Sequence, residues 1–320
     1  MKNFSMWKVN YMNKIAVLFP GQGSQYIGMG KNLYDEFDIA KKIFGEANEI
    51  LAFNLSKLCF DGSLNELTKT SNAQAALLTV SYIMYKTFIE KNGIVPSFLA
   101  GHSLGEISAL CCSGAIDFKE ALILAKNRGL YMQACTEKHN GSMCAAISDN
   151  LEKIEDYCNE ISSTEEPIVI SNYNSQNQII VSGYKKKIDE FRSWSRENNI
   201  KTVLLKTSGA FHSPLMNEAA NNLDEFLKNI EFTLPNIPVI SNVTAKPYKN
   251  ASDIHKGLVI QMVSSVKWLD TIKFLDENAV NTFIECGSKN VLKNLAKSII
   301  PTTNTYSLDI KYDLEFLSRR

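Results

Sequence analysis

The 320-residue sequence lacks an excess of either charge, a long apolar run and any C-x-x-C pair. Lysine and arginine together number 34, as do aspartate and glutamate, so nothing in the composition indicates a nucleic-acid partner. No apolar stretch approaches the roughly 20 residues that cross a membrane. The seven cysteines show neither metal-ligand spacing nor a disulfide framework, so we expect packed, reduced thiols, no metal site and a cytoplasmic protein.

The ends and short charged runs of the chain carry little chemistry. The first thirteen residues lack the apolar core of a signal peptide, and we expect residues 1–12 to form a loose extension before the first strand. Three consecutive lysines at 185–187 precede a helical pattern. They indicate a solvated helix start, although such a run could also attract an acidic partner.

Strands alternate with helices through most of the chain, which predicts an α/β fold with helices packed on a parallel sheet. The expected strands of this large domain cover 14–19, 96–102, 237–242 and 281–287, and its helices cover 29–52, 72–91, 104–113, 117–135, 214–229, 254–263, 268–277 and 290–299.

The middle of the chain has a different order of expected elements, β-α-β-β-α-β, which is the order of a ferredoxin-like unit. Its expected strands cover 142–148, 167–174, 178–183 and 201–207, with helices ending near 161 and covering 184–198. We therefore predict a small ferredoxin-like domain at 139–207, inserted into a large α/β domain formed by 1–138 and 208–320.

A serine turn follows the second expected strand, in "AGHSLGEISALCCSGA" at 100–115. Gly101-His102-Ser103-Leu104-Gly105 fits G-x-S-x-G, in which small residues let a strand turn sharply into a helix and expose the serine. In that geometry the N–H of Leu104 points to where an acyl oxygen becomes negative, and the helix dipole adds to the effect. A glycine-flanked turn with an N-capping serine is the alternative without chemistry.

Only four histidines could serve as the base for Ser103. His102 is expected to project to the other side of the strand, and His139 and His255 resemble exposed loop residues. His212 lies in "SGAFHSP", apolar before and turn-forming after, where the large domain resumes. By elimination His212 is the candidate base, and a core histidine bonded to the backbone is the alternative.

Six segments form a recognisable series along the chain: "LFPGQGSQ" (18–25), "GHSLGE" (101–106), "NRGLYMQ" (127–133), "GAFHS" (209–213), "IQMVSSVKW" (260–268) and "IECGSKNVLKNL" (284–295). In their order and spacing the chain resembles the malonyl-CoA:acyl carrier protein transacylases. The resemblance covers about residues 14–300. The family's fold, a hydrolase-like parallel-sheet domain with a ferredoxin-like insertion, agrees with the pattern described above.

The resemblance implies a role for particular residues. Ser103 would be the nucleophile and His212 its base, with the main-chain carbonyl of Gln261 orienting the imidazole in place of an acidic residue. Gln22 and Leu104 would offer main-chain N–H groups to the oxyanion. Arg128 would pair with the free carboxylate of the malonyl group, since a planar guanidinium holds a carboxylate with two parallel hydrogen bonds.

Substrate choice also involves Phe211, which is expected to narrow the pocket around malonyl C2. The resemblance implies transfer of a malonyl group from malonyl-CoA to the phosphopantetheine thiol of holo acyl carrier protein, through a malonyl-serine intermediate, for fatty acid biosynthesis. No cofactor is required, because malonyl-CoA is a substrate and the partner carries the phosphopantetheine. We expect a monomer without nucleic-acid or membrane partners.

Two departures from the family pattern keep a second pathway open. Ser265 stands where the family generally has proline, and Ser288-Lys289 where Pro-Gly is common. A discrete acyltransferase or acyl hydrolase serving a polyketide synthase is therefore the alternative. Three weaker hypotheses for the function are a general esterase, an editing hydrolase and a non-catalytic docking module. "PGQGSQYIGMG" lacks the third glycine of a dinucleotide fingerprint, which excludes a Rossmann cofactor site.

Overall fold

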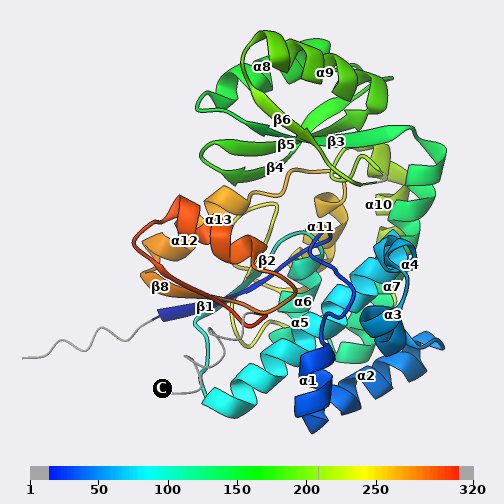
Figure 1. Ribbon diagram of the computed structural model, residues 1–320, viewed down its shortest axis with the longest axis vertical. Helices are drawn as coiled ribbons and strands as arrows, with labels where there is room; N and C mark the ends of the chain where they lie inside the picture. The colour runs from blue at the N-terminus through cyan, green and yellow to red at the C-terminus, as the bar shows by residue number, and fades with distance from the viewer. Residues whose placement is uncertain (1–13, 208, 310–320) are drawn as a thin grey trace, which may run out of the picture.

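A five-stranded parallel sheet, in the order β7-β2-β1-β8-β9, lies at the centre of the larger unit (Figure 1). The computed structural model describes residues 14–207 and 209–309. The strands are β1 (Lys14–Phe19), β2 (Phe98–Gly101), β7 (Val239–Ile240), β8 (Val280–Glu285) and β9 (Asn304–Ser307). Because parallel strands direct their carboxyl ends to one edge, the loops after β1, β2, β7 and β8 meet there.

Each face of this sheet is covered by a different group of helices. Along β1, Val17 and Phe19 join one core while Ala16 and Leu18 join another, as the two-residue period of a strand requires. The first core also takes side chains from α5 (Thr70–Asn92), α6 (Leu104–Cys112), α7 (Phe118–Lys138), α10 (Asn217–Leu227) and α11 (Ala251–Gln261). The second is closed by α12 (Trp268–Glu277) and α13 (Val291–Ile299).

The smaller unit is an antiparallel sheet in the order β4-β5-β3-β6, coloured green at the top of Figure 1. Its chain order is β3 (Gly141–Ile147), α8 (Leu151–Ile161), β4 (Ile168–Ser175), β5 (Gln178–Tyr184), α9 (Lys185–Glu197) and β6 (Lys201–Leu204). The apolar faces of α8 and α9 pack on it around Ile154 and Phe191. The predicted fold class, a parallel-sheet domain with a ferredoxin-like unit, is confirmed.

The two sheets are joined by main-chain hydrogen bonds at the segment that follows α11. The N–H of Val266 donates to the oxygen of Ser171 at 2.9 Å, and the N–H of Tyr173 donates to the oxygen of Val266 at 3.0 Å. Ser265, at the family's proline position, donates its hydroxyl to the oxygen of Ile170. The small sheet is therefore fixed to the large unit a few residues from Gln261.

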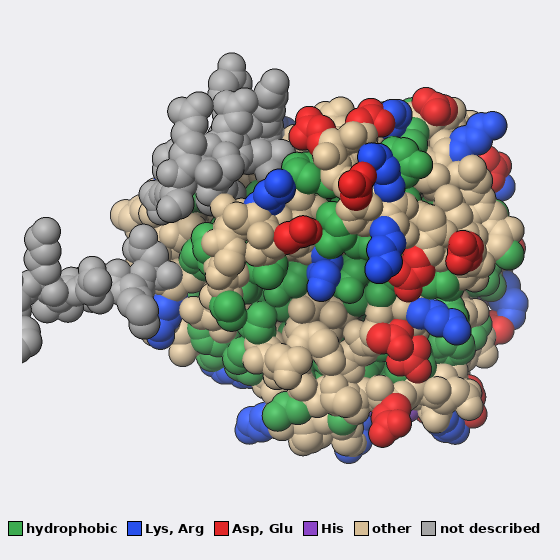
Figure 2. Space-filling model, turned by 90° about the horizontal axis from the view of Figure 1, so that it is seen from below, with side chains coloured by type: hydrophobic (Ala, Val, Ile, Leu, Met, Phe, Trp, Pro, Cys, Tyr) green, Lys and Arg blue, Asp and Glu red, His purple; other side chains and the backbone are tan. Residues whose placement is uncertain are grey.

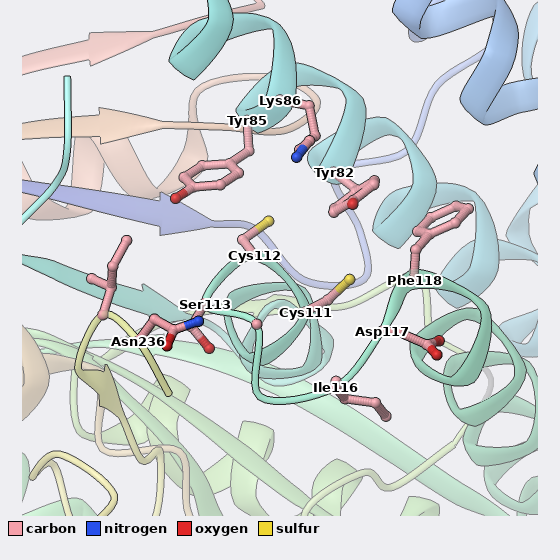
Figure 3. A pocket seen from close by; sticks show the side chains of 12 residues that line it. Tyr82, Tyr85, Lys86, Cys111, Cys112, Ser113, Ile116, Asp117, Phe118 and Asn236 are labelled. Atoms are coloured by element: carbon pink, nitrogen blue, oxygen red, sulfur yellow. The ribbon is translucent and has the colours of Figure 1, made fainter. Parts of the chain in front are cut away.

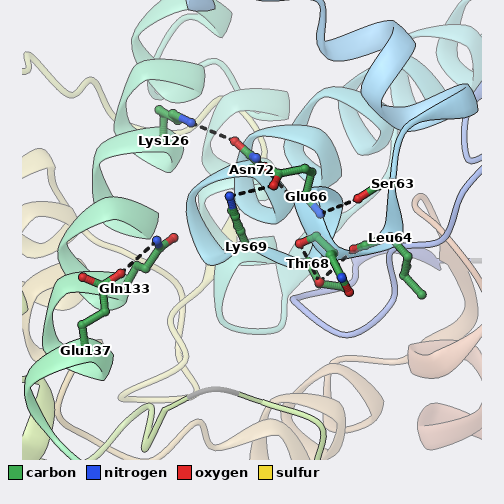
Figure 4. Close-up of polar contacts among 10 residues, drawn as sticks. Ser63, Leu64, Glu66, Thr68, Lys69, Asn72, Lys126, Gln133 and Glu137 are labelled. Atoms are coloured by element: carbon green, nitrogen blue, oxygen red, sulfur yellow. Dashed lines mark hydrogen bonds and ion pairs between the residues drawn. The ribbon is translucent and has the colours of Figure 1, made fainter.

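Two short helices precede α5, which packs closely against α7. The helices α3 (Leu55–Asp61) and α4 (Leu64–Thr68) have side-chain caps, and the hydroxyl of Ser63 accepts the N–H of Glu66 at 3.1 Å (Figure 4). The ammonium of Lys126 on α7 donates to Asn72 on α5 at 2.9 Å (Figure 4). A Cβ at Gly129 would lie 2.5 Å from the Cα of Ser71, so the glycine lets the two helices approach closely. Arg128 is placed by this contact.

Several predicted boundaries were wrong. The expected helix 29–52 is two helices, α1 (Lys31–Glu36) and α2 (Asp38–Leu51), because Phe37 is extended at φ −126°. The expected strand 237–242 pairs only over β7, after which the chain turns through Ser241, whose oxygen accepts the N–H of Ala245. Strand β6 ends at Leu204, and β9 was not anticipated.

The surface carries charges of both signs. Figure 2 shows basic and acidic side chains interspersed over the face opposite the small sheet. The three lysines at 185–187 pair with Asp189, Glu166 and Glu190, so they do not form a free basic patch. All seven cysteines are free, as predicted. The expectation for residues 1–12 lies outside the described residues.

Candidate active site

Ser103 occupies a strained turn between β2 and α6. Its backbone lies at φ 53° and ψ −109°, a conformation that L-residues rarely adopt. A Cβ at Gly101 would lie 1.9 Å from the carbonyl of Gly105, and a Cβ at Gly105 would lie 1.9 Å from the oxygen of Phe19. Both glycines are therefore required by close backbone crossings, as a nucleophile elbow demands.

His212 lies directly beside this serine. Its Nε2 is 2.8 Å from the Oγ of Ser103, and its Nδ1 is 2.7 Å from the main-chain oxygen of Gln261. Because a carbonyl oxygen can only accept, Nδ1 carries the proton and Nε2 is free to accept one. Burial, followed by the positive charge of Arg128, lowers the pKa of His212 to about 3, so the ring is neutral near pH 7.

Arg128 is buried next to the same hydroxyl. Its Nη2 donates to Ser103 Oγ at 3.2 Å and to Gln261 Oε1 at 2.8 Å, while Nη1 donates to Gln74 Oε1 at 2.9 Å. The side chain is 1% exposed, and its Nε has no acceptor among the described residues. Burial lowers its pKa to about 10, which leaves the guanidinium charged near neutral pH.

The loop after β1 runs against the elbow. The N–H of His102 donates to the oxygen of Phe19 at 2.9 Å, and a Cβ at Gly21 would lie 2.5 Å from the oxygen of His102. Within 14–207 and 209–309, the main-chain N–H groups of Gln22 and Leu104 donate to no protein acceptor. The oxyanion role of these two N–H groups stays a prediction.

Phe211 is 5% exposed and belongs to the main core, and its main-chain oxygen accepts the hydroxyl of Ser182 on β5 at 2.8 Å. This bond ties the segment before the histidine to the small sheet. His212 itself has φ 56°, so the chain reverses sharply at the base as it does at the nucleophile.

Two buried residues beneath the elbow were missed by the sequence analysis. Asn242 follows β7 and accepts the N–H of Ser103 at 2.7 Å, and Glu106, in the first turn of α6, accepts from Gln261 Nε2 and the Tyr248 hydroxyl. Burial raises the pKa of Glu106 to about 7, partly offset by hydrogen bonds and the charge of Arg128. The motif around Ser103 contains Glu106, but an acidic first turn is ordinarily solvated, so it gave no signal.

The other three histidines, all within the described residues, make no hydrogen bond to the serine hydroxyl and have other partners. His102 contacts Asn174 Oδ1 through Nε2 at 3.1 Å and packs on the ring of Trp268. The prediction that His255 lies in an exposed loop was wrong, because it lies in α11 and contacts Asp224 at 2.7 Å. His139 caps the end of α7 with its ring edge on Tyr184.

A hollow of about 350 Å³ opens onto His212 between the two sheets. Its lining includes Val169 and Ile170 of β4 and Ser264, Ser265 and Lys267 of the joining segment. Pro214, Val243 and Val263 complete the lining from the large unit, so the hollow has apolar residues from both units and its polar groups come from the large unit.

A second hollow, of about 410 Å³, lies at the opposite end of α6 (Figure 3). Cys111 and Cys112 point into it, about 12 Å along the helix from Leu104. Burial raises the pKa of both thiols above the ordinary value, so they are weak nucleophiles at neutral pH. This hollow is separate from the serine and histidine.

Residues 14–207 and 209–309 contain no group of three or more histidine, cysteine, aspartate or glutamate side chains that could hold a metal ion. Among the helices of those ranges, none has the length and apolar character to span a membrane.

Comparisons with known proteins identify the family that the chain resembles. Residues 17–301 match the acyl transferase domain family. The chain is 41% identical over 289 residues to the malonyl CoA-acyl carrier protein transacylase of Bacillus subtilis strain 168, covering 90% of this chain and 91% of that one. It is 39% identical to the polyketide biosynthesis malonyl CoA-acyl carrier protein transacylase PksC of the same strain, covering 89% and 96%.

A solved structure has a closely similar fold. It is described as a type II PKS acyl-carrier protein in complex with its malonyl-transacylase, PlMCAT:AntF. The similarity has a TM-score of 0.92 at 35% identity, covering 96% of this chain and 99% of that one.

Proposed function

The chain belongs to the acyl transferase domain family, and we propose that it transfers a malonyl group from malonyl-CoA to the phosphopantetheine thiol of holo acyl carrier protein. One observation carries this proposal: a serine hydroxyl lies 2.8 Å from a neutral imidazole and 3.2 Å from a buried guanidinium. The first pair suits acyl transfer through a serine ester. The guanidinium selects an acyl group that carries its own carboxylate.

The first half-reaction begins at the thioester carbonyl. Ser103 Oγ attacks the carbon while His212 Nε2 takes the hydroxyl proton. The negative oxygen of the tetrahedral intermediate receives hydrogen bonds from the N–H groups of Gln22 and Leu104. When the C–S bond breaks, the imidazolium gives its proton to the departing CoA thiolate, leaving malonyl-Ser103.

The second half-reaction reverses these roles with a different thiol. The phosphopantetheine thiol of the carrier protein gives its proton to His212 as the sulfur attacks the ester carbonyl. Collapse of the intermediate breaks the bond to Ser103 Oγ, which recovers the proton from the imidazolium. The Gln261 carbonyl holds Nδ1–H throughout, so the same nitrogen handles the proton in both steps.

Arg128 supplies the selectivity. Its buried Nε has no acceptor among the described residues, and its Nη2 donates only to the neutral oxygens of Ser103 and Gln261. A malonyl carboxylate would accept from Nε and could take the place of a neutral acceptor at Nη2, with charge-assisted hydrogen bonds. Phe211 would limit bulk at malonyl C2, where one methyl group is worth only about 1–3 kcal/mol.

The pathway we propose is fatty acid biosynthesis, in the cytoplasm and with the enzyme acting as a monomer and without a cofactor. The seven free cysteines favour a reducing compartment. The alternative, a discrete acyltransferase or acyl hydrolase serving a polyketide synthase, is supported by the 39% identity to PksC.

Product analysis tests this function. The protein is incubated with malonyl-CoA and either holo or apo carrier protein, and the carrier is weighed by intact mass spectrometry. We expect one malonyl group on the holo carrier alone, none with Ser103→Ala, and normal transfer with the exposed control Ser298→Ala. Release of free malonate without a malonylated carrier would contradict transfer and favour a hydrolase. Rates with fatty-acid and polyketide carriers then distinguish the pathways.

A further inference from the structure

The amide of Asn242 brackets the serine turn from below. Its Oδ1 accepts the main-chain N–H of Ser103 at 2.7 Å, and its Nδ2 donates to the main-chain oxygen of Gly101 at 2.6 Å. One side chain thus holds the backbone on both sides of His102, although it lies 139 residues away from Ser103. The strained φ of 53° at Ser103 needs such an external restraint to persist.

Asn242 is itself held in place on several sides. It is 0% exposed, its main-chain N–H donates to Glu106 Oε1 at 3.3 Å, and its main-chain oxygen accepts the N–H of Lys267 at 2.9 Å. Glu106 is fixed in turn by Tyr248 and Gln261. The amide therefore has little freedom to choose another rotamer.

The same amide contacts the support of the histidine. Gln261 Nε2 lies 3.3 Å from Asn242 Oδ1 and donates to the main-chain oxygen of Ser103 at 3.1 Å. The main-chain oxygen of Gln261 holds His212 Nδ1 at 2.7 Å. Asn242 is thus connected to the serine directly and to the histidine through one residue.

We propose that Asn242 is a positioning residue for the reaction, which aligns the Ser103 hydroxyl with His212 by bracketing the turn between Gly101 and Ser103. This role rests on the serine mechanism proposed above and does not involve contact with the substrate. Arg128 is held by Gln74 as well as by Gln261, and no hydrogen bond joins it directly to Asn242 among the described residues, so we expect the Asn242 substitutions to affect the serine more than recognition of the acyl carboxylate.

An amide is the group that this position needs, because one atom must accept and the other must donate. Aspartate keeps the acceptor for the Ser103 N–H but places an oxygen against the Gly101 carbonyl, where a donor is required. It also adds a negative charge beside Glu106. Asn242→Asp therefore breaks one half of the bracket at nearly constant shape, and Asn242→Ala removes both halves.

The test measures the reactivity of Ser103 without relying on any acyl donor. A fluorophosphonate probe labels activated serines, and its second-order rate of attachment to Ser103 is followed by mass spectrometry. We expect a loss of about tenfold to a hundredfold for Asn242→Asp and at least as much for Asn242→Ala, because small misplacements of a nucleophile carry costs of this size. The KM for malonyl-CoA should stay within about twofold.

A matched control separates positioning from a general loss of stability. Asn54 caps α3 through the N–H of Lys57 at 2.7 Å, far from the serine turn. Asn54→Ala should lower the thermal midpoint and leave the labelling rate unchanged at temperatures where the protein is folded.

The outcomes are distinct. Labelling of both Asn242 variants within about twofold of the unsubstituted protein overturns the positioning role, as does a loss that merely follows the thermal midpoint in all three variants. Failure of the unsubstituted protein to label at Ser103 overturns the serine mechanism itself and this role with it. Slow labelling at normal KM, with a normal rate in Asn54→Ala, supports the role.

Discussion

At the scale of single residues, burial determines the charge states on which the chemistry depends. His212 is kept neutral by burial and by the nearby positive charge of Arg128, both of which oppose the imidazolium that each half-reaction requires. A carboxylate bound to Arg128 offsets part of that charge. The substrate's own acid group therefore favours protonation of the base, in addition to binding.

The substitution Arg128→Ala tests both parts of this account. We expect malonyl transfer to lose about 2–5 kcal/mol of transition-state stabilisation, because the carboxylate loses its buried partner, while acetyl transfer survives or improves. Removing the positive charge also raises the pKa of His212. The acidic limb of the acetyl-CoA rate profile should therefore move to higher pH.

The measurement is kcat/KM for malonyl-CoA and acetyl-CoA from about pH 3 to about pH 8, a range that includes the pKa of His212 in the unsubstituted protein. The control is Arg192→Ala on α9, whose guanidinium lies 3.9 Å from Asp189 on the small unit. An unchanged malonyl-to-acetyl ratio in Arg128→Ala would remove the assigned role.

Some site residues could be predicted from local sequence signals, and others could not. Ser103 follows a local pattern, and His212 could be found because only four histidines compete. Asn242 and Glu106 have no local signature, since their partners lie 139 and 155 residues away, at Ser103 and Gln261. Buried polar residues of this kind are recognised only once the fold brings their partners together.

At the scale of elements, the site depends on how closely β1, β2 and α6 approach. The helix crosses directly over the ends of both strands, and Gly101 and Gly105 leave no room for a side chain. The turn after β2 was predictable for that reason. The break at Phe37 and the short strand β7 were not, because the apolar pattern continues across both places and gives no sign of where regular backbone pairing stops.

A glycine-to-alanine pair tests the close crossing. Gly105→Ala places a Cβ 1.9 Å from the oxygen of Phe19. We expect this clash to lower the free energy of unfolding by about 1–3 kcal/mol or more and to abolish transferase activity. Gly45→Ala in α2 meets nothing within 4 Å and should raise stability by up to about 1 kcal/mol. Urea unfolding midpoints measure both changes, and similar effects of the two would contradict the crossing.

At the scale of the whole molecule, the presence of two sheets could be predicted from the order of strands and helices in the sequence, but the contact between the sheets could not. The bonds between Val266 and β4 join main-chain groups, which no side-chain pattern encodes. A second property of the whole fold comes from Glu285, the buried last residue of β8, whose carboxylate accepts the N–H of Lys293 in the first turn of α13 at 2.8 Å.

Glu285 predicts a pH-dependent stability. Burial raises its pKa from 4.5 to about 8, so the folded state holds a proton that the unfolded state releases between these values. Its contribution is full below pH 4.5 and is lost as the pH rises through about 8. Glutamine has no proton to lose, so Glu285→Gln should not show this loss. Between pH 4.5 and about pH 8, the free energy of unfolding of the variant minus that of the unsubstituted protein should rise by at most about 1.4 kcal/mol per pH unit. Urea unfolding at about pH 5 and about pH 8 measures this difference for both proteins, and the same difference at the two pH values would contradict the prediction.

The central claim is that Ser103 carries the acyl group between two thiols. A brief incubation with malonyl-CoA, acid quenching and peptide mapping should locate one malonyl group on Ser103, and addition of holo carrier protein before the quench should remove it from the enzyme and place it on the carrier. A malonyl group found on any other residue, or one that stays on Ser103 while the carrier is malonylated at the full rate, would contradict the account.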